Sequence, residues 1–163
     1  MKMRLVKESL NEFGKGNNPM TTLGLGYKAS IIKFFENLGY ITNKDKYGNK
    51  FYTIEDDNTI IVNGDLNIYM GLMLFKIKLL IDTMFELPDN LIIKGDLVLT
   101  TVPIKKLPNN LTVEGILYLN YTNITELPND LECYEISIDK QKQQDLYIWI
   151  ENSKFKYKIQ KYI

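Results

Sequence analysis

The chain contains no histidine, and among its 163 residues it has a single cysteine, Cys133. Histidine is the usual general base near neutral pH, the commonest metal ligand and the normal partner of a serine or cysteine nucleophile. A lone cysteine excludes an internal disulfide and every Cys-x-x-Cys motif used for zinc or redox chemistry. These two absences predict a protein that is not an enzyme, holds no cofactor or metal, and occupies a reducing compartment such as the cytoplasm.

Charge and hydropathy point to neither a nucleic-acid partner nor a membrane. Lysine plus arginine and aspartate plus glutamate number 20 each, so no net field draws the chain toward a polyanion. The start of the chain has charges but no uninterrupted apolar core of signal-peptide length. The most apolar run, residues 68–80, is interrupted by Lys76 and Lys78 and is too short to cross a bilayer. We expect a cytoplasmic protein without a membrane partner.

What the chain does have is an internal repeat. Leu-Pro recurs at residues 87, 107 and 127, a spacing of 20 residues. Apolar residues hold matching places inside the first two units: Leu91, Ile93, Leu97, Leu99 and Ile104 in the first, and Leu111, Val113, Leu117, Leu119 and Ile124 in the second. Self-similarity at a fixed short period is typical of a solenoid. The predicted fold is α+β, a short solenoid with a parallel sheet, an N-terminal capping helix and a C-terminal cap.

Each repeat is expected to place one short strand in the sheet. The pairs Leu97 with Leu99 and Leu117 with Leu119 predict parallel strands whose leucines point into the core, while the residue between them points outward. The Thr122 hydroxyl is expected to bond loop backbone groups. The outward residues form the predicted partner-binding face: Lys76, Lys78, Asp96, Val98, Thr100, Ile116, Tyr118 and Asn120. Tyr118 is the strongest anchor in this set, because aromatic residues carry much of the energy of protein interfaces.

The segments around the repeats divide the chain into four parts: an N-terminal arm at 1–26, a capping helix and loop at 27–50, the solenoid at 51–138 and the C-terminal cap at 139–163. Apolar spacing predicts a helix over 27–38, with Ile31, Ile32, Phe35 and Leu38 on one face and Gly39 as its left-handed cap. Alternating residues in 52–54 and 60–62 predict two strands joined by a turn at 56–58. Asp56, Asp57 and Asp65 lack the spacing of a calcium loop and are interpreted as turn residues.

Three stretches depart from the simple repeat. Residues 69–86 are either an amphipathic helix or a degenerate repeat, and the second is preferred because counting back 20 residues places Met73 at the Ile93 position and Ile77 at that of Leu97. In the last unit Glu135 replaces the glycine, and the pair Ile136 and Ile138 comes one residue early, which indicates repeat decay. Residues 140–163 are either a helix capped by Asp139 or a hairpin about residues 152–153; we favour a helix over 140–152.

These motifs carry a resemblance to a known class of protein. The consensus LPxNLxVxGxLxLxxTxIxxLP resembles the short leucine-rich repeats of bacteria, and more closely leucine-rich-repeat-like proteins encoded by tailed bacteriophages. Residues 52–68 are similar to the hairpin that precedes such repeats, and residues 8–26 to the N-terminal segment of the phage proteins. The resemblance implies a curved parallel sheet that binds other proteins. Val102 and Thr122 stand where standard repeats have asparagine.

The leading hypothesis is therefore a non-enzymatic protein-binding module that acts in the cytoplasm of an infected bacterial cell. The alternative is a structural or packaged component of the phage virion, docked by the arm at 1–26. A nucleic-acid partner is the least favoured: Lys154, Lys156 and Lys158 alternate with aromatic residues, a pattern that suits phosphate contacts and stacking, but lysines more often protect a solvated edge strand.

Overall fold

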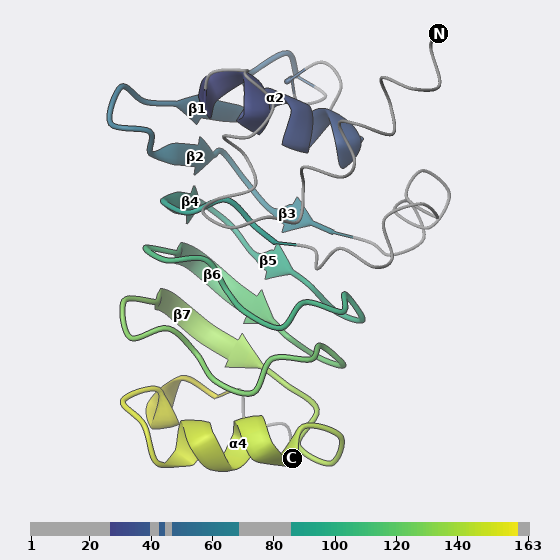
Figure 1. Ribbon diagram of the computed structural model, residues 1–163, viewed down its shortest axis with the longest axis vertical. Helices are drawn as coiled ribbons and strands as arrows, with labels where there is room; N and C mark the ends of the chain where they lie inside the picture. The colour runs from purple at the N-terminus through teal and green to yellow at the C-terminus, as the bar shows by residue number, and fades with distance from the viewer. Residues whose placement is uncertain (1–26, 40–42, 45–46, 69–85, 160–163) are drawn as a thin grey trace, which may run out of the picture.

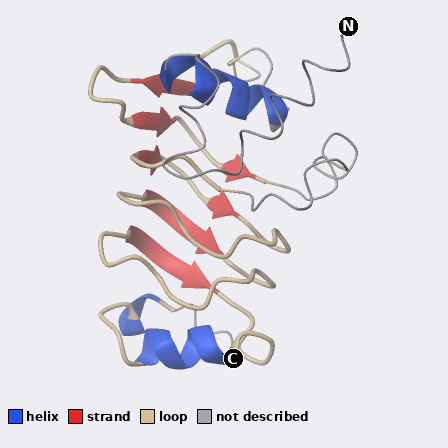
Figure 2. Ribbon diagram, in the orientation of Figure 1, coloured by secondary structure: helices blue, strands red, loops and turns tan. Residues whose placement is uncertain are grey.

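The computed structural model describes residues 27–39, 43–44, 47–68 and 86–159. Within them the chain is a mixed α+β fold with a mostly parallel seven-stranded sheet (Figures 1 and 2). The strands are β1 (Tyr52–Ile54), β2 (Ile60–Val62), β3 (Leu66–Asn67), β4 (Leu91–Ile93), β5 (Leu97–Val98), β6 (Thr112–Tyr118) and β7 (Glu132–Ser137). The helices are α2 (Tyr27–Asn37), α4 (Gln144–Glu151) and the 3-10 helix η1 (Lys156–Lys158). The predicted arm at 1–26 lies outside the described residues.

The strands lie in four successive levels, with α2 near one end of the stack and α4 at the other (Figure 1). Level 1 comprises β2 and β3, level 2 comprises β4 and β5, level 3 is β6 and level 4 is β7. Parallel pairing joins each level to the next, and between levels 2 and 3 it matches Ile93 with Val113 and Leu97 with Leu117. The repeat of 20 residues is thus confirmed as the register of the sheet at this point.

The interpretation of residues 69–86 as a degenerate repeat is wrong. Such a unit would insert a strand between levels 1 and 2, but these levels pair directly, Ile60 with Leu91 and Leu66 with Leu97. The offset here is therefore longer than one repeat, and β2 and β4 are direct neighbours in the sheet. Residues 69–85, including Lys76 and Lys78 of the predicted binding face, lie outside the described residues.

A single apolar core runs through all four levels. The inward positions predicted from the repeat are confirmed, since Leu97, Leu99, Leu117 and Leu119 are fully buried. Matching positions of the other levels join the same cluster: Ile60, Val62, Leu66 and Ile68 in level 1, Leu91 and Ile93 in level 2, Leu111 and Val113 in level 3, and Leu131, Cys133, Ile136 and Ile138 in level 4. Each fully buried aliphatic side chain contributes about 1.5 to 3 kcal/mol relative to exposure. The stack is held together chiefly by this burial.

Carboxylates and glycines explain how closely the levels approach. Asp65 Oδ1 accepts a hydrogen bond from Asp96 N at 2.9 Å, and Asp96 Oδ1 accepts one from Ile116 N at 2.8 Å. A Cβ on Gly95 would lie 2.1 Å from the first carboxylate oxygen, and one on Gly115 would lie 2.2 Å from the second. Glycine is required at both places because the aspartate of the preceding level occupies the space of a side chain.

This ladder ends at level 4, where the repeat loses a residue. Ile116 stands where the earlier level has Asp96, so it offers no carboxylate to the next strand. Glu114 and Gly115 together face one residue, Tyr134, because the register shifts between Val113 pairing with Cys133 and Ile116 pairing with Glu135. The predicted early arrival of Ile136 is confirmed, and the β-bulge absorbs the missing residue.

The corners between levels use side chains at left-handed backbone positions. Asn90 and Asn110, 20 residues apart, have φ of 58° and 52°, a conformation that asparagine tolerates better than most residues. Asn110 Nδ2 donates to Asn90 Oδ1 at 2.8 Å. The Thr122 hydroxyl donates to the Leu119 carbonyl at 2.8 Å, which confirms the predicted role of that hydroxyl.

Helix α2 packs its aromatic face on the first hairpin. Its predicted extent and the left-handed Gly39 (φ 99°) are confirmed. Ile31 and Phe35 are fully buried, and the Phe35 ring stacks on that of Tyr52 at 4.1 Å. The prediction for Ile32 is wrong, since that side chain is 43% exposed and Phe34 packs on the core in its place.

The hairpin of β1 and β2 is confirmed as predicted. Tyr52 pairs with Val62 and Ile54 with Ile60 in an antiparallel register. Asp57 behaves as a turn residue: its Oδ1 accepts from Thr59 N at 2.9 Å, and this bond lowers the pKa of the Asp57 carboxyl. Asp56 lies in the same turn, but its carboxylate pairs with Lys28 Nζ at 3.2 Å, and Asp65 bonds the backbone of level 2, so the prediction for Asp65 is wrong.

The C-terminal segment contains a helix, so the hairpin alternative is wrong. Helix α4 begins at Gln144 and its N-cap is Gln143, which makes no side-chain capping bond. Asp139 caps an earlier turn instead, since its Oδ1 accepts from the N–H groups of Gln141 and Lys142, both at 3.0 Å. The predicted start at 140 is therefore about one turn too early, because that local bond holds the backbone in a turn.

Candidate binding surface

The outer side of β3, β5 and the second halves of β6 and β7 brings several predicted residues together. Val98 pairs with Tyr118, and Tyr118 pairs with Ser137, so these three residues form one row across levels 2 to 4. Ser137 is buried and adds no contact area to the row. Asn67 extends the row in level 1 through its pairing with Val98. Val98 and Tyr118 are half-buried, which leaves an aliphatic and an aromatic surface side by side.

Other predicted residues of this face have structural partners. Asp96 is held against the Ile116 amide, so its carboxylate helps to align two levels. Asn120 Oδ1 accepts from the Ser137 hydroxyl at 3.1 Å. Thr100, Ile116 and Asn120 are half-buried like their neighbours. These contacts leave no signal in the sequence, because each joins outward residues of different levels.

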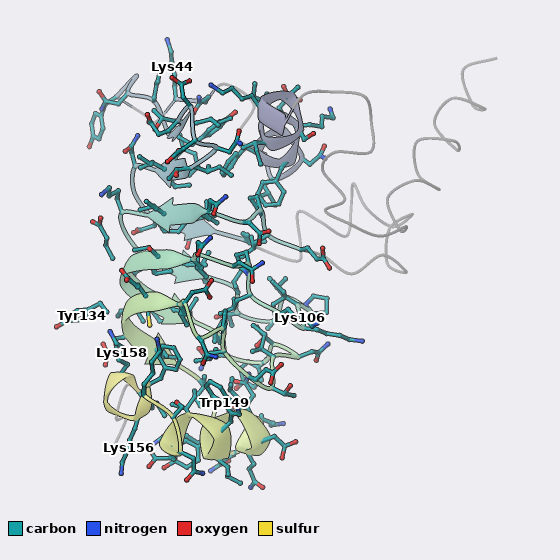
Figure 3. The ribbon with its side chains drawn as sticks, turned by 60° about the vertical axis from the view of Figure 1, so that its left-hand side comes forward. Lys44, Lys106, Tyr134, Trp149, Lys156 and Lys158 are labelled. Carbon is teal, nitrogen blue, oxygen red and sulfur yellow. The ribbon has the colours of Figure 1, made fainter. Side chains whose placement is uncertain are left out.

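A second surface lies at level 4, on the first half of β7. A depression of about 530 Å³ is lined on one side by Thr112 and Glu114 of β6 and on the other by Lys154, Phe155 and Lys158. Between them lie Leu131, Glu132, Cys133 and Tyr134. Tyr134 is 73% exposed, and Figure 3 shows it extending away from the stack on the side where Lys158 lies. The sequence analysis did not identify this surface.

The lysines after α4 contact the main chain of level 4. Lys154 Nζ donates to the Asn129 carbonyl at 2.5 Å, and Lys158 Nζ donates to the Cys133 carbonyl. Residues 154–158 are not a strand: they lead into and form η1. Two of the three lysines considered for a nucleic-acid site are thus hydrogen-bonded to protein carbonyls.

Cys133 lies in the floor of the depression and has little reactivity. Burial raises the pKa of its thiol to about 11, against the opposing effect of Lys158 and Lys154. The thiol, a weak nucleophile, therefore predominates near neutral pH. Within the described ranges, no group of three or more Cys, Asp or Glu side chains lies close enough to hold a metal ion.

Comparison with known proteins leaves the chain without an assigned family. No protein-family model, no curated protein and no solved structure matches it. In the part of the chain that the structure describes, no helix has the length and apolar character needed to cross a bilayer. The candidate surfaces therefore have to be judged on their own geometry.

Proposed function

We propose that this chain is a short leucine-rich-repeat-like solenoid that acts as a non-enzymatic protein-binding module, encoded by a phage and active in the bacterial cytoplasm. The observation that supports it is the row of Asn67, Val98 and Tyr118, three half-buried side chains held in register by parallel pairing. A row of this kind presents contact area on a backbone that is already ordered, and pre-organisation lowers the entropic cost of binding.

Tyr118 and Val98 carry most of the expected affinity. They lie at the centre of the row and combine an aromatic with an aliphatic side chain, the composition expected of an interface anchor surrounded by polar groups. Asn120 and Thr100 flank them and supply the polar rim. Asp96 contributes through the alignment of levels 2 and 3, since its carboxylate bonds Ile116 N.

Photo-crosslinking in living bacteria tests this proposal. Benzoylphenylalanine is placed at Tyr118, at Val98 or, as the control, at Glu126, an exposed residue of the segment that connects levels 3 and 4. We expect one protein adduct from the first two positions and none from the third. Adding Val98→Asp to the chain labelled at 118 should abolish the adduct while the melting temperature stays within a few degrees. An identical adduct pattern from all three positions would contradict the proposal.

A further inference from the structure

The first half of β7 is an open edge of the sheet. In the first half of every earlier level, the strand has the strand of the next level beside it: β4 lies next to β2, β6 next to β4, and β7 next to β6. Among the described residues, no strand pairs with the other side of β7 before Ile136, which forms a parallel bridge with Ile159. Glu132 N donates to the Leu111 carbonyl, so the main chain of Cys133 faces the open side, as the alternation of a parallel strand requires.

The depression at level 4 follows this open edge. Its floor is apolar and consists of Val113, Leu131, Cys133 and Phe155, all of them buried. Its volume of about 530 Å³ lies within the roughly 300–1,000 Å³ of ligand pockets. The first half of β7 is thus bordered by a depression whose lining includes buried apolar side chains.

Lysine side chains serve this edge only in part. Lys158 Nζ bonds the Cys133 carbonyl and Lys154 Nζ bonds the Asn129 carbonyl. An ammonium group has three donors and no acceptor, so neither lysine can serve an N–H group of the edge. Both stems are flexible, so a bound strand can displace the ammonium groups, and Lys158 competes with it for the Cys133 carbonyl. An incoming main chain offers the same donors together with carbonyl acceptors.

We propose that the open edge of β7 binds a short extended peptide of a partner protein, which adds one strand to the sheet. Strand addition draws affinity from main-chain hydrogen bonds and specificity from alternate side chains. The site fits a single strand rather than a complete further level or a second copy of the chain, because α4 lies beyond level 4 at this end of the stack (Figure 1).

The side chains of the edge specify the peptide. Glu132 is exposed and makes no ion pair within the described residues, so a lysine or arginine opposite it forms a favourable cross-strand pair. The next peptide residue faces Cys133 and Phe155 and is therefore apolar. The residue after that lies beside the exposed ring of Tyr134 and is aromatic. The partner peptide thus has a basic, an apolar and an aromatic residue in that order. This site is separate from the row around Tyr118 and does not depend on it.

Fluorescence anisotropy with the full chain tests the site. The probe is a fluorescein-labelled peptide of sequence STKVYTS, with STEVYTS as the charge control and STKVYTS N-methylated at Val and Tyr as the backbone control. We expect saturable binding of the first peptide, weaker binding of the second by up to about fivefold, and none of the third. Glu132→Lys, an exposed substitution, should reverse the preference between the first two peptides.

Two further measurements locate the peptide and test the lysine. Amide shifts in a two-dimensional NMR spectrum should change at residues 131–135 and not in α2. Lys158→Ala should strengthen binding severalfold, because the peptide no longer competes for the Cys133 carbonyl; a purely structural role for Lys158 would leave affinity unchanged. Three outcomes would each overturn the proposal. The N-methylated peptide could bind as well as the first peptide, neither the wild type nor Lys158→Ala could show saturable binding, or Lys158→Ala could dimerise in place of binding the peptide.

Discussion

The two ends of the stack are closed in different ways. At the start, the edge strand β1 is covered by the amide of Asn43, whose Oδ1 accepts from Tyr52 N at 2.8 Å and whose Nδ2 donates to the Tyr52 carbonyl at 3.1 Å. At the other end, the buried amide of Gln143 serves the second half of level 3: its Nε2 donates to the Leu119 carbonyl at 2.9 Å and its Oε1 accepts from Tyr121 N at 3.2 Å. Both amides act as a donor and an acceptor at once, as a neighbouring strand would.

Among the described residues, the first half of level 4 has no such amide. Lys158 can only donate, so on this edge it serves the Cys133 carbonyl and no N–H group. Lysines on a sheet edge discourage uncontrolled pairing without blocking the main chain permanently. The edges at Asn43 and Gln143 are therefore permanently closed, whereas the first half of β7 is reversibly covered.

The largest loss of folding stability is expected inside the stack, and the losses at the two ends are compared with it. Gly115→Ala would place a Cβ 2.8 Å from the carbonyl of Gly95, so levels 2 and 3 must separate. We expect a loss of about 3 kcal/mol in the free energy of unfolding, measured by urea denaturation. Glu135→Ala, one level on, should stay within about 0.5 kcal/mol, because the preceding level has Ile116 in place of an aspartate. Equal losses would show that the carboxylate ladder does not set the spacing.

Removal of the Gln143 amide should be the next most costly change. Gln143→Ala leaves the part-buried N–H groups of Tyr121 and Asp139 without their acceptor, whereas the Leu119 carbonyl keeps its bonds from the amide and the hydroxyl of Thr122. The expected loss is about 2 kcal/mol, because two donors lose their acceptor at once. Gln144→Ala is the matched control: it alters an exposed residue one position later and should be nearly neutral. If both variants unfold at the same urea concentration, Gln143 does not close the stack.

The periodic part of this architecture was predictable from sequence. Leu97 and Leu117 repeat at 20 residues because each must fill the same place in a continuous core, and that requirement leaves a regular apolar pattern. Gly-Asp-Leu also recurs at 64–66 and 95–97, and the spacing of these two motifs equals the offset between levels 1 and 2. The assumption of a uniform 20-residue period concealed this longer spacing.

The closing groups left no comparable pattern. Gln143 lies in a polar run, and its partners Leu119, Tyr121 and Thr122 are 21 to 24 residues away. The bond between Asn43 and Tyr52 occurs once and likewise has no period. The partial cover of the β7 edge was also unpredictable, because it depends on a hydrogen bond from Lys158 to a carbonyl 25 residues earlier. Sequence thus reports what recurs through the stack, while its ends depend on single contacts.

At the N-terminal end, Asn43→Ala should be milder than the change at Gln143. The site is only partly buried, so water can replace the lost amide, and we expect a loss of about 1 kcal/mol. Hydrogen exchange at the Tyr52 amide should accelerate, since its acceptor has gone. Asn123→Ala, which removes an exposed side chain between levels, is the control. Unchanged exchange at Tyr52 would mean that α2 alone protects this edge.

The smallest effect concerns the thiol beneath the reversibly covered edge. Burial raises the pKa of Cys133 to about 11, so the folded chain keeps this proton to higher pH than the unfolded chain. As pH rises from about 9 to about 11, the unfolded state ionises first, and folding stability falls, by about 0.8 kcal/mol at pH 9.5. Cys133→Val, which copies the matching Val113, should remove this part of the pH dependence. Peptide bound along β7 would cover the thiol further and slow its alkylation at pH 9, whereas a ligand on the Tyr118 row would leave the alkylation rate unchanged.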